Sequence, residues 1–572
     1  MGLTVSSKGV ATVDGISAAR FLKENGTLER YRQNTTQNKQ SFFSKDYWIA
    51  ATISYHRMQM QAVTGIGFDS GQASSLAERI EGMMKEIESE IEPKLPERPL
   101  NKGETDYWRI PAKPFNKDGE LSSTMLKWME KTGAKIYQFG DGFSSRLQAL
   151  LDDHKYIELD GETYPIIGGT ETKTKGKMTL ANQDDLKDWL IRDCGWKPTL
   201  WNVKKDARGK PMRDDKGNVI QTSPKMQENG KLCPNLEALQ GDLVRPVVKW
   251  LSLRNRKSVI EGWLDQPRLA FDGRQSASAT GFTNTFRYRH SNVVNCPKAD
   301  PKVVLGKEMR SLFVCNRPGY KFVGYDATAL EARVEAHYCL QYEGGKEHSE
   351  KILTGDVHSL NAFLFYRDEL LGLGFTHAYD GIKDDERFKP YRNRAKNGAY
   401  SMAYGASVKK FAATIGKPVD EAEEAYENYW NGNPALKQLK ERLTMAWEQS
   451  GKRWVRGIDG RKVFTRSKHS LVNSLFQSCG AIVMELSTIF MDKWLGGLVL
   501  DKDNYPCYSY KGYTVYRTGF FHDELCFEAP EEIAEEIAQL GVKSIEAAGR
   551  HLKTRVPLTG EGKVNTDWAG VH

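Results

Sequence analysis

The chain has 572 residues, 39% of them hydrophobic, and a formal charge of +8, so it is long enough for several domains and its charge suits a polyanionic partner. The eight cysteines form no C-x-x-C pair, which excludes the usual patterns of a zinc site or a disulfide framework and favours reduced thiols. We find no signal peptide and no run long enough to span a membrane, and we expect a cytoplasmic protein.

The first hundred residues are polar and then helical. Residues 1–47 show no periodic apolar face and predict an extended arm. Residues 48–68 predict a helix followed by a turn. Apolar side chains at helical spacing predict an amphipathic helix from Leu76 to Ile91.

Residues 93–177 are rich in proline, glycine and lysine, and they predict a long irregular segment. A capped helix is predicted after it, in N-Q-D-D-L-K-D-W-L-I-R. Helical periodicity then returns over residues 224–257.

An aspartate follows the short apolar run F-V-G-Y, which predicts a strand that ends at Asp326. Residues 329–338 have apolar side chains at helical spacing and predict a helix. Asp326 is therefore expected at a strand-to-helix junction, with Glu331 in the first helical turn.

A ladder of cations and aromatic residues occupies residues 392–405, R-N-R-A-K-N-G-A-Y-S-M-A-Y-G. Arg392, Lys396, Tyr400 and Tyr404 recur every four residues, so on a helix they share a stripe about 120° wide and about 18 Å long. A nucleoside triphosphate has the same polarity, anionic at one end and flat at the other, and Arg and Lys suit its phosphates. A solvated amphipathic helix is the alternative. A parallel ridge of small residues would let the helix pack closely on a neighbour: Ala395, Ala399 and Ala403.

A hairpin is predicted in G-F-F-H-D-E-L-C-F-E, with its tip at His522-Asp523-Glu524. Asp326 at a strand end and Asp523 at a hairpin tip can converge only if both elements belong to one sheet. Converged carboxylates repel and favour a bound divalent cation such as Mg²⁺. Two such ions about 4 Å apart can activate an attacking 3′-oxygen and stabilise leaving pyrophosphate. A solvated turn is the alternative for a lone Asp-Glu pair.

These motifs, in this order, resemble those of family A (Pol I type) DNA polymerases. The resemblance is carried by five segments: 320–340, 354–361, 392–406, 457–482 and 519–528. The stretch 457–481 is similar to the replicative polymerases of short-tailed bacteriophages, and the resemblance extends from about residue 48 to the C-terminus.

The resemblance implies an α+β fold of the right-hand type, with an antiparallel palm sheet, helical fingers and a helical thumb. The domains it implies are an N-terminal arm at 1–47, a thumb region at 48–260 with an insertion at about 93–177, a first part of the palm at 261–340, fingers at 341–472 and a second part of the palm at 473–572.

Carried over residue by residue, the resemblance implies three groups of site residues. The catalytic residues would be Asp326, Asp523 and Glu524, with two Mg²⁺ ions held by Asp326, the Ala327 carbonyl and Asp523. The nucleotide-binding residues would be Glu331, His358, Arg392, Lys396 and Tyr400. The DNA-binding residues would be Arg287, Tyr404, Gly405, Asn473, Gln477 and His522.

One DNA-binding position is ambiguous, because Thr280-Gly281 is followed by Phe282 where the family usually has arginine. Alignment backwards from Asn292 favours Arg287, and Arg289 is its rival.

The implied reaction is template-directed addition of dNTPs to a primer 3′ end in phage DNA replication. The implied partners are primer-template DNA and dNTPs. The segment 93–177 has the place of a thumb insertion that can bind a processivity protein in phage polymerases, and a DNA-facing or flexible loop is the alternative. About 47 residues precede the predicted thumb helices, too few for a 3′–5′ exonuclease domain, so we expect proofreading only from a separate exonuclease chain.

Two alternatives remain open. A single-subunit RNA polymerase or reverse transcriptase is one, although Glu331 and the H-D-E tip argue against it. The other is a catalytically dead, DNA-binding replication subunit, against which the intact carboxylates and the Arg392–Lys396 pair argue.

Overall fold

The structure is a computed structural model. It describes residues 3–5, 11–13, 16–17, 45–99, 111–132, 135–136, 156–159, 162–167 and 175–571, apart from residues 208, 216, 218, 229–230, 238, 302, 355, 380 and 404. The chain divides into two compact units, Met1–Ala77 with Val259–His572, and Glu78–Ser258. We call them unit 1 and unit 2 and describe each by itself.

Unit 1 is built on a six-stranded sheet in which every neighbouring pair is antiparallel. The strand order is β21-β22-β23-β24-β18-β25. The bounds are Leu498–Leu500 for β21, Pro506–Tyr510 for β22, Tyr513–Phe521 for β23, Glu524–Pro530 for β24, Tyr320–Ala327 for β18 and Gly560–Asn565 for β25. The sheet brings together strands almost two hundred residues apart in the sequence, as the two predicted acidic motifs require.

Helix α22 (Ala534–His551) covers one face of this sheet. Its Gly541 lies against the ring of Tyr325, and a Cβ there would come within 2.1 Å of that ring. Because strand side chains alternate between faces, Tyr325 points to this helix and its neighbour Asp326 points to the opposite face.

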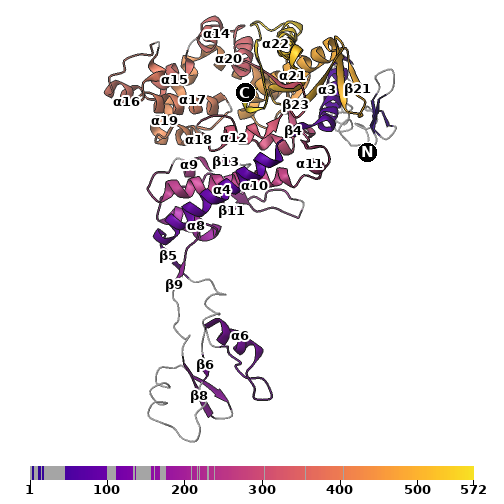
Figure 1. Cartoon of the computed structure of the whole chain (residues 1–572). Helices are drawn as coiled ribbons and strands as arrows, with labels where there is room; N and C mark the ends of the chain where they lie inside the picture. The colour runs from indigo at the N-terminus through magenta and orange to yellow at the C-terminus, as the bar shows by residue number, and fades with distance from the viewer. Residues whose placement is uncertain are drawn as a thin grey trace. The chain divides into compact units, whose positions relative to one another are not determined.

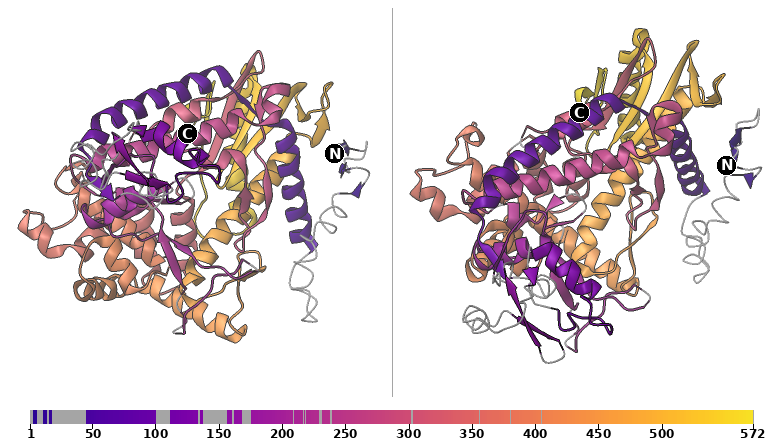
Figure 2. Two further views of the ribbon diagram at one scale, coloured as in Figure 1. Left: turned by 90° about the horizontal axis from the view of Figure 1, so that it is seen from below. Right: turned by 60° about the horizontal axis from the view of Figure 1, so that its bottom comes forward.

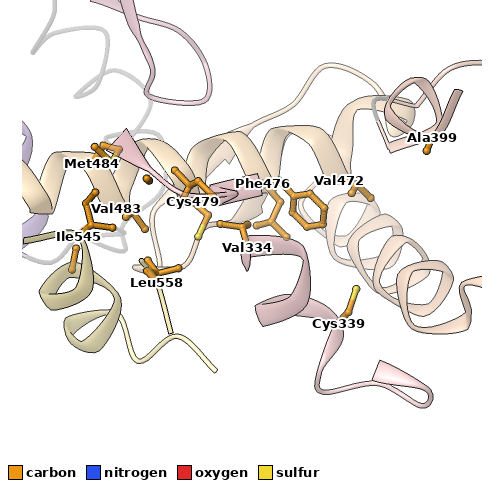
Figure 3. Close-up of a cluster of buried hydrophobic side chains, with 14 of the residues drawn as sticks. Val334, Cys339, Ala399, Val472, Phe476, Cys479, Val483, Met484, Ile545 and Leu558 are labelled. Atoms are coloured by element: carbon orange, nitrogen blue, oxygen red, sulfur yellow. The ribbon is translucent and has the colours of Figure 1, made fainter. Parts of the chain in front are cut away.

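Helix α21 (Leu471–Trp494) is the core helix of unit 1. Figure 3 shows Val472, Phe476, Cys479 and Val483 along it, facing residues of α13 (Leu330–Cys339) and α22. Together with the turn before it, α21 forms the segment Lys468–Trp494. By length and composition alone this segment is long and apolar enough to cross a membrane, which we did not expect. Its most apolar stretch is 72% buried inside the protein, as a core helix would be.

The predicted cationic ladder lies within a second group of helices in unit 1 (Figure 1). The bounds are Leu330–Cys339 for α13, Gly345–Thr354 for α14, Val357–Phe365 for α15, Arg367–Gly372 for α16, Lys389–Ala403 for α17, Val408–Ile415 for α18, Val419–Gly432 for α19 and Pro434–Gln449 for α20. The predicted ridge of small residues is confirmed at Ala395 and Ala399, which are buried in α17.

Helix α3 (Lys45–Thr64) runs beside the strands of the sheet (Figure 2). It begins three residues before the predicted start at residue 48, and its Arg57 donates a 2.8 Å hydrogen bond to Asp492 of α21. Residues 66–68 form strand β4, not the predicted turn, because β14 (Arg274–Gln275) and β17 (Phe313–Val314) pair with it. The contacts place this helix in unit 1, although the thumb was predicted from residue 48.

The remaining described elements of unit 1 are short. They are α11 (Pro267–Asp272), β15 (Ala279–Phe282), β16 (Tyr288–His290), α12 (Gly306–Ser311), β19 (Trp454–Arg456) and β20 (Lys462–Phe464). In the predicted N-terminal arm, three strands form an antiparallel sheet that we did not expect: β1 (Leu3–Val5), β2 (Ala11–Val13) and β3 (Ile16–Ser17).

The helices predicted for unit 2 are largely confirmed. They are α4 (Ser70–Ile91, which begins in unit 1), α8 (Gln183–Arg192, capped by Asn182) and α10 (Val244–Leu264, which ends in unit 1). The predicted helical stretch from residue 224 is wrong in its first part. There the chain forms β11 (Gln221–Pro224), β12 (Gln227–Glu228), β13 (Lys231–Leu232) and the short helix α9 (Pro234–Glu237), with β11 paired to β10 (Trp201–Val203).

The irregular segment at 93–177 is closed at its base by strand pairing. Strand β5 (Glu97–Pro99) pairs with β9 (Lys175–Lys177). Its described elements are α6 (Ser123–Thr132), β6 (Lys135–Ile136), β7 (Tyr156–Leu159) and β8 (Glu162–Ile167). The chain therefore leaves and re-enters the rest of unit 2 at adjacent strands, which is the geometry of an insertion.

A buried carboxylate stabilises the sheet of unit 1. Glu528 is 0% exposed and accepts hydrogen bonds from Arg274 at 2.7 Å and Arg317 at 2.8 Å. We expect Glu528→Gln to lower the free energy of unfolding of unit 1 by about 3–5 kcal/mol, because it leaves two guanidinium groups without their counter-charge. Urea denaturation followed by tryptophan fluorescence would measure this.

The matched control is Glu531→Gln, whose ion pair with Lys321 at 3.2 Å is largely exposed. It should cost less than about 1 kcal/mol. Equal losses for the two variants would contradict the structural role given to Glu528.

Candidate active site

The acidic end of the site is built by the pairing of β18 with β24. Asp326 lies opposite Glu524 in this ladder, and beyond it the Ala327 N–H donates a 3.2 Å hydrogen bond to the Asp523 carbonyl. Asp523 and His522 form the two-residue tip between β23 and β24, with His522 at a positive φ of 60°. The tip is thus one residue shorter than predicted, since Glu524 already begins β24. The two aspartates are held at adjacent positions, as the sequence predicts.

The three acidic side chains have different environments. Asp326 is half-buried and Asp523 is exposed. Glu524 is 5% exposed and accepts a 2.8 Å hydrogen bond from the Trp568 indole N–H. The structure therefore separates Glu524 from its two acidic neighbours by burying it.

A cavity of about 910 Å³ in unit 1 gathers many of the predicted site residues. Its lining includes Arg287, Ala327, Glu331, His358, Arg392, Tyr400, Asn473 and Asp523. The lining does not include Asp326, Lys396, Gly405, Gln477, His522 and Glu524. Tyr404 lies outside the described residues. Residues from β18, α13, α15, α17, α21 and the hairpin tip thus share one cavity.

Helices α15 and α17 are tied together by an ion pair. Asp356 caps α15 through Ser359 and also accepts hydrogen bonds from Arg392 Nε at 2.7 Å and Nη2 at 2.9 Å. Burial alone would raise the pKa of Asp356, but the hydrogen bonds from Arg392 and Ser359 outweigh it and lower the pKa to about 2. The guanidinium of Arg392 is therefore held in a fixed orientation by a carboxylate that stays charged.

Asp356 is a site residue that we did not predict. The motif T-G-D-V-H-S pointed to His358 alone. An Asp three residues before a Ser at a helix start is a capping signal, and it could have identified Asp356.

His358 and Tyr400 face each other across the same part of the cavity, with ring centroids 5.8 Å apart. Burial, followed by the charges of Lys396 and Arg392, lowers the pKa of His358 to about 4, so the ring is neutral at pH 7. Its Nδ1 is buried and has no hydrogen-bond partner within the described part of the chain. Lys396 is exposed one helical turn before Tyr400. This end of the cavity offers the Arg392 cation and an unused imidazole nitrogen, and the charge of Lys396 acts on it from outside the lining.

Glu331 lies in the first turn of α13, as predicted, and lines the cavity beside Tyr400. Burial raises the pKa of the Tyr400 hydroxyl, and the charges of Glu331 and Glu335 raise it further. Arg287 is 3.7 Å from Glu331. Of the two arginines left open by the sequence, Arg287 lines the cavity, whereas Arg289 is exposed and outside the lining.

Asn473 and Gln477 lie one turn apart on α21, and Asn473 reaches the cavity. The Asn473 side-chain oxygen is buried with no hydrogen-bond partner among the described residues. Gly405 follows α17 at a positive φ of 74°, with the His469 carbonyl where a Cβ would be. Its glycine is thus required by backbone packing, whatever further role it has.

His522 at the hairpin tip adjoins a second, much smaller cavity of about 10 Å³. Its ring centroid is 5.2 Å from that of His290. Burial and then the charge of Arg287 lower the pKa of His522. Since Arg287 lines both cavities, it connects the hairpin tip with the main cavity.

The acidic end fits a hard divalent cation with few protein ligands. The residues that could hold such an ion are Asp326 and Asp523, through carboxylate oxygens, and Ala327, through its carbonyl. No group of three or more His, Cys, Asp or Glu residues that could hold a metal ion exists in the described part of the chain. Mg²⁺ accepts such a site because it usually binds one or two carboxylates and keeps waters and substrate phosphates as its other ligands.

Histidines of lowered pKa make the stability of the fold depend on pH. Burial is the main cause in each: the pKa is lowered to about 4 in His56, His337 and His358 and to about 3 in His290. The pKa of His522 is lowered too. Below pH about 6.5 the unfolded chain binds these protons and the folded chain does not. We expect the free energy of unfolding to fall as the pH drops from about 6.5 towards 4, measured by urea denaturation.

The control compares two histidines. His337→Gln should reduce this slope, since the buried ring accepts a hydrogen bond from the Arg555 N–H. His377→Gln, at an exposed position, should leave the slope unchanged. A stability that is flat between pH 7.5 and 5 would contradict the prediction.

Comparisons with known proteins find DNA polymerases among the relatives of this chain. The DNA-directed DNA polymerase of Enterobacteria phage T3 is 26% identical over 457 residues, covering 77% of this chain and 59% of that protein. The DNA-directed DNA polymerase of Escherichia phage T7 is 26% identical over 443 residues, covering 74% of this chain and 57% of that protein. The chain therefore spans less than two thirds of the length of these two relatives.

A third relative matches nearly end to end. The DNA-directed DNA polymerase of Escherichia phage Phieco32 is 23% identical over 628 residues, covering 90% of this chain and 97% of that protein. Among solved structures, the POL domain of Pol1 from M. smegmatis, in complex with DNA primer-template and dNTP, shares the fold with a TM-score of 0.57 at 16% identity. That match covers 91% of this chain and 70% of the other.

The model of DNA polymerase family A matches residues 234–570. This match includes the acidic strand β18, the cationic helix α17 and the hairpin tip. Because it covers more than half of the sequence, the chain belongs to DNA polymerase family A.

Proposed function

We propose that the chain is a DNA-directed DNA polymerase that adds dNTPs to a primer 3′ end. One observation carries the proposal: a single cavity is lined by Arg392 and Tyr400 of α17 and by Asp523, which lies more than a hundred residues later in the sequence. An acidic group, a phosphate-binding cation and an aromatic ring are the parts that nucleotidyl transfer needs. The names of the phage relatives, each a DNA-directed DNA polymerase, support it.

Arg392, Lys396 and His358 would bind the triphosphate. The guanidinium of Arg392 is already oriented by Asp356, so little side-chain entropy is lost when a phosphate binds to its remaining N–H groups. The neutral His358 would act as a hydrogen-bond donor and not as a charge, since its pKa is about 4.

Asp326, Asp523 and the Ala327 carbonyl would hold Mg²⁺. Two bound ions would supply positive charge next to the attacking 3′-oxygen and the leaving pyrophosphate. The protein fixes the two carboxylates through the β18–β24 ladder and the hydrogen bond from the Ala327 N–H to Asp523. Glu524, buried behind them, is left without a direct role at the metal.

The remaining residues would select the sugar and hold the DNA. Tyr400 would lie beside the deoxyribose, and Glu331 would exclude a ribose 2′-hydroxyl. Arg287, Asn473 and Gln477 would contact the minor groove near the primer end, where acceptors are shared between base pairs and the contacts are insensitive to sequence. The remaining DNA contacts are those proposed for Tyr404, Gly405 and His522.

We also propose the domain assignment and the biological setting. The six-stranded sheet would be the palm, the helices around α17 the fingers, and unit 2 most of the thumb, in an enzyme of phage DNA replication in the host cytoplasm. The closed base of the segment at 93–177 supports an insertion that binds a processivity protein. Loss of that partner from a pull-down after deletion of residues 100–174 would test this.

Primer extension tests the proposed function. We expect the wild-type chain to extend a primer on a DNA template with dNTPs and Mg²⁺, and Asp523→Asn to lower kcat at least about a thousandfold, since it removes a metal ligand. Primer-template binding, measured by fluorescence anisotropy, should stay within about threefold. A wild-type chain that binds DNA without extending it would instead support the inactive-subunit alternative.

The same assay separates synthesis from degradation. We propose that this chain has no 3′–5′ exonuclease, so a mismatched primer end should stay intact without dNTPs. Shortening of that primer by the pure chain would contradict this. If variants of the polymerase site still shorten the primer, the chain has a second active site.

Sugar selection gives an independent test. We expect Glu331→Ala to raise kcat/KM for rNTPs relative to dNTPs at least about tenfold, because it opens space beside the sugar. Glu335→Ala, one turn further along α13 and also lining the cavity, is the matched control and should leave the ratio within about twofold. An unchanged ratio in Glu331→Ala, or equal use of rNTPs by the wild type, would contradict the assignment.

A further inference from the structure

The C-terminal segment 566–571 lies on the face of the sheet that carries Asp326. The Cys315 N–H donates a 2.9 Å hydrogen bond to the Thr566 carbonyl, and the Trp568 N–H donates a 2.8 Å hydrogen bond to the Phe313 carbonyl. Val571 fills the space where Gly324 lacks a Cβ, which would come within 2.7 Å of it. Gly324 is two residues before Asp326 in β18, so both face the same side. The segment therefore packs next to the acidic site, on the same face of the sheet as Asp326.

Trp568 connects this segment with the buried carboxylate beside the catalytic tip. Its indole N–H donates the 2.8 Å hydrogen bond to Glu524, and the indole itself is 2% exposed. Arg310 lies over the indole ring at 4.2 Å and places its guanidinium 3.8 Å from Glu524. A buried carboxylate needs such partners, since without them burial costs several kcal/mol or more. Glu524 is thus fixed in a direction away from the cavity.

The same indole also contacts the other strand of the hairpin. The ring of Phe521, the last residue of β23, lies 4.7 Å from Trp568 at an angle of 31°. Phe521 and Glu524 flank the tip. Trp568 therefore contacts both the residue before His522 and the residue after Asp523.

We propose that Trp568 is a positioning residue for the catalytic metal site: it fixes the hairpin tip through Glu524 and Phe521 and so sets the place of the Asp523 carboxylate. Glu524 is the anchor of the tip and not a metal ligand. This inference rests on the proposed function, because it presumes that Asp523 binds the metal.

Mn²⁺ binding tests the proposal independently of turnover. The probe is Mn²⁺ itself, followed by the electron paramagnetic resonance signal of the free ion. The sample is the full chain with primer-template DNA, a dideoxy-terminated primer and dNTP. Trp568→Phe keeps an aromatic ring and removes the N–H. We expect it to weaken Mn²⁺ binding at least fivefold, and to lower kcat while KM for the dNTP stays within threefold.

The matched control is Trp447→Phe, which removes an indole N–H bonded at 3.1 Å to the Thr465 carbonyl, outside the acidic site. It should lose a similar amount of thermal stability and keep Mn²⁺ affinity within twofold. Equal Mn²⁺ affinity in Trp568→Phe and the wild type would overturn the proposal, as would equal weakening in the two variants.

Glu524→Gln decides the question if Trp568→Phe does not fold. An amide oxygen can still accept from the indole, so we expect Mn²⁺ affinity within threefold of the wild type. A loss above tenfold would make Glu524 a ligand and overturn the proposal. Asp523→Asn separates the two levels: if wild-type Mn²⁺ binding does not depend on Asp523, the proposed function fails as well. If wild-type Mn²⁺ binding depends on Asp523 and Trp568→Phe binds Mn²⁺ as tightly as the wild type, only the positioning role of Trp568 fails.

Discussion

The structure of the site depends on the antiparallel ladder between β18 and β24. This ladder continues to the hydrogen bond between the Ala327 N–H and the Asp523 carbonyl. It brings the backbones of Asp326 and Asp523 to neighbouring positions, although the like charges of the two residues repel. The energy for this comes from the buried sheet around it, where strands β23 and β24 are almost completely buried. The ends of strands in a rigid sheet can thus keep like charges close together, whereas an isolated loop would relax and separate them.

A second constraint fixes the phosphate-binding end relative to the first. The ion pair of Asp356 and Arg392 joins α15 to α17, and buried small residues such as Gly398 let α17 pack closely on α18. Arg392 is therefore oriented before any substrate arrives. In the proposed polymerase, preorganised charges at both ends of one cavity would place the triphosphate between the carboxylates and the aromatic ring.

Local patterns predicted much of this. The strand with Asp326 near its end, the helix with Glu331 in its first turn and the helix that carries Arg392, Lys396 and Tyr400 each follow from a few neighbouring residues, and the structure has all three. The strand ends one residue later than predicted, and Tyr404 lies outside the described residues. The direction of Glu524 could not be predicted, because it depends on Trp568 and Arg310, which are far away in the sequence. Strand β4 was missed for the same reason, since its partners follow about two hundred residues later.

The most direct measurement is a crystal structure of the chain with primer-template DNA, a non-reactive dNTP analogue and Mn²⁺, with the ions located by anomalous scattering. The account predicts Mn²⁺ bound by Asp326 and Asp523, with the triphosphate on Arg392, Lys396 and His358. It also predicts that Glu524 stays hydrogen-bonded to Trp568. Mn²⁺ bound by Glu524, or a triphosphate bound away from α17, would contradict it.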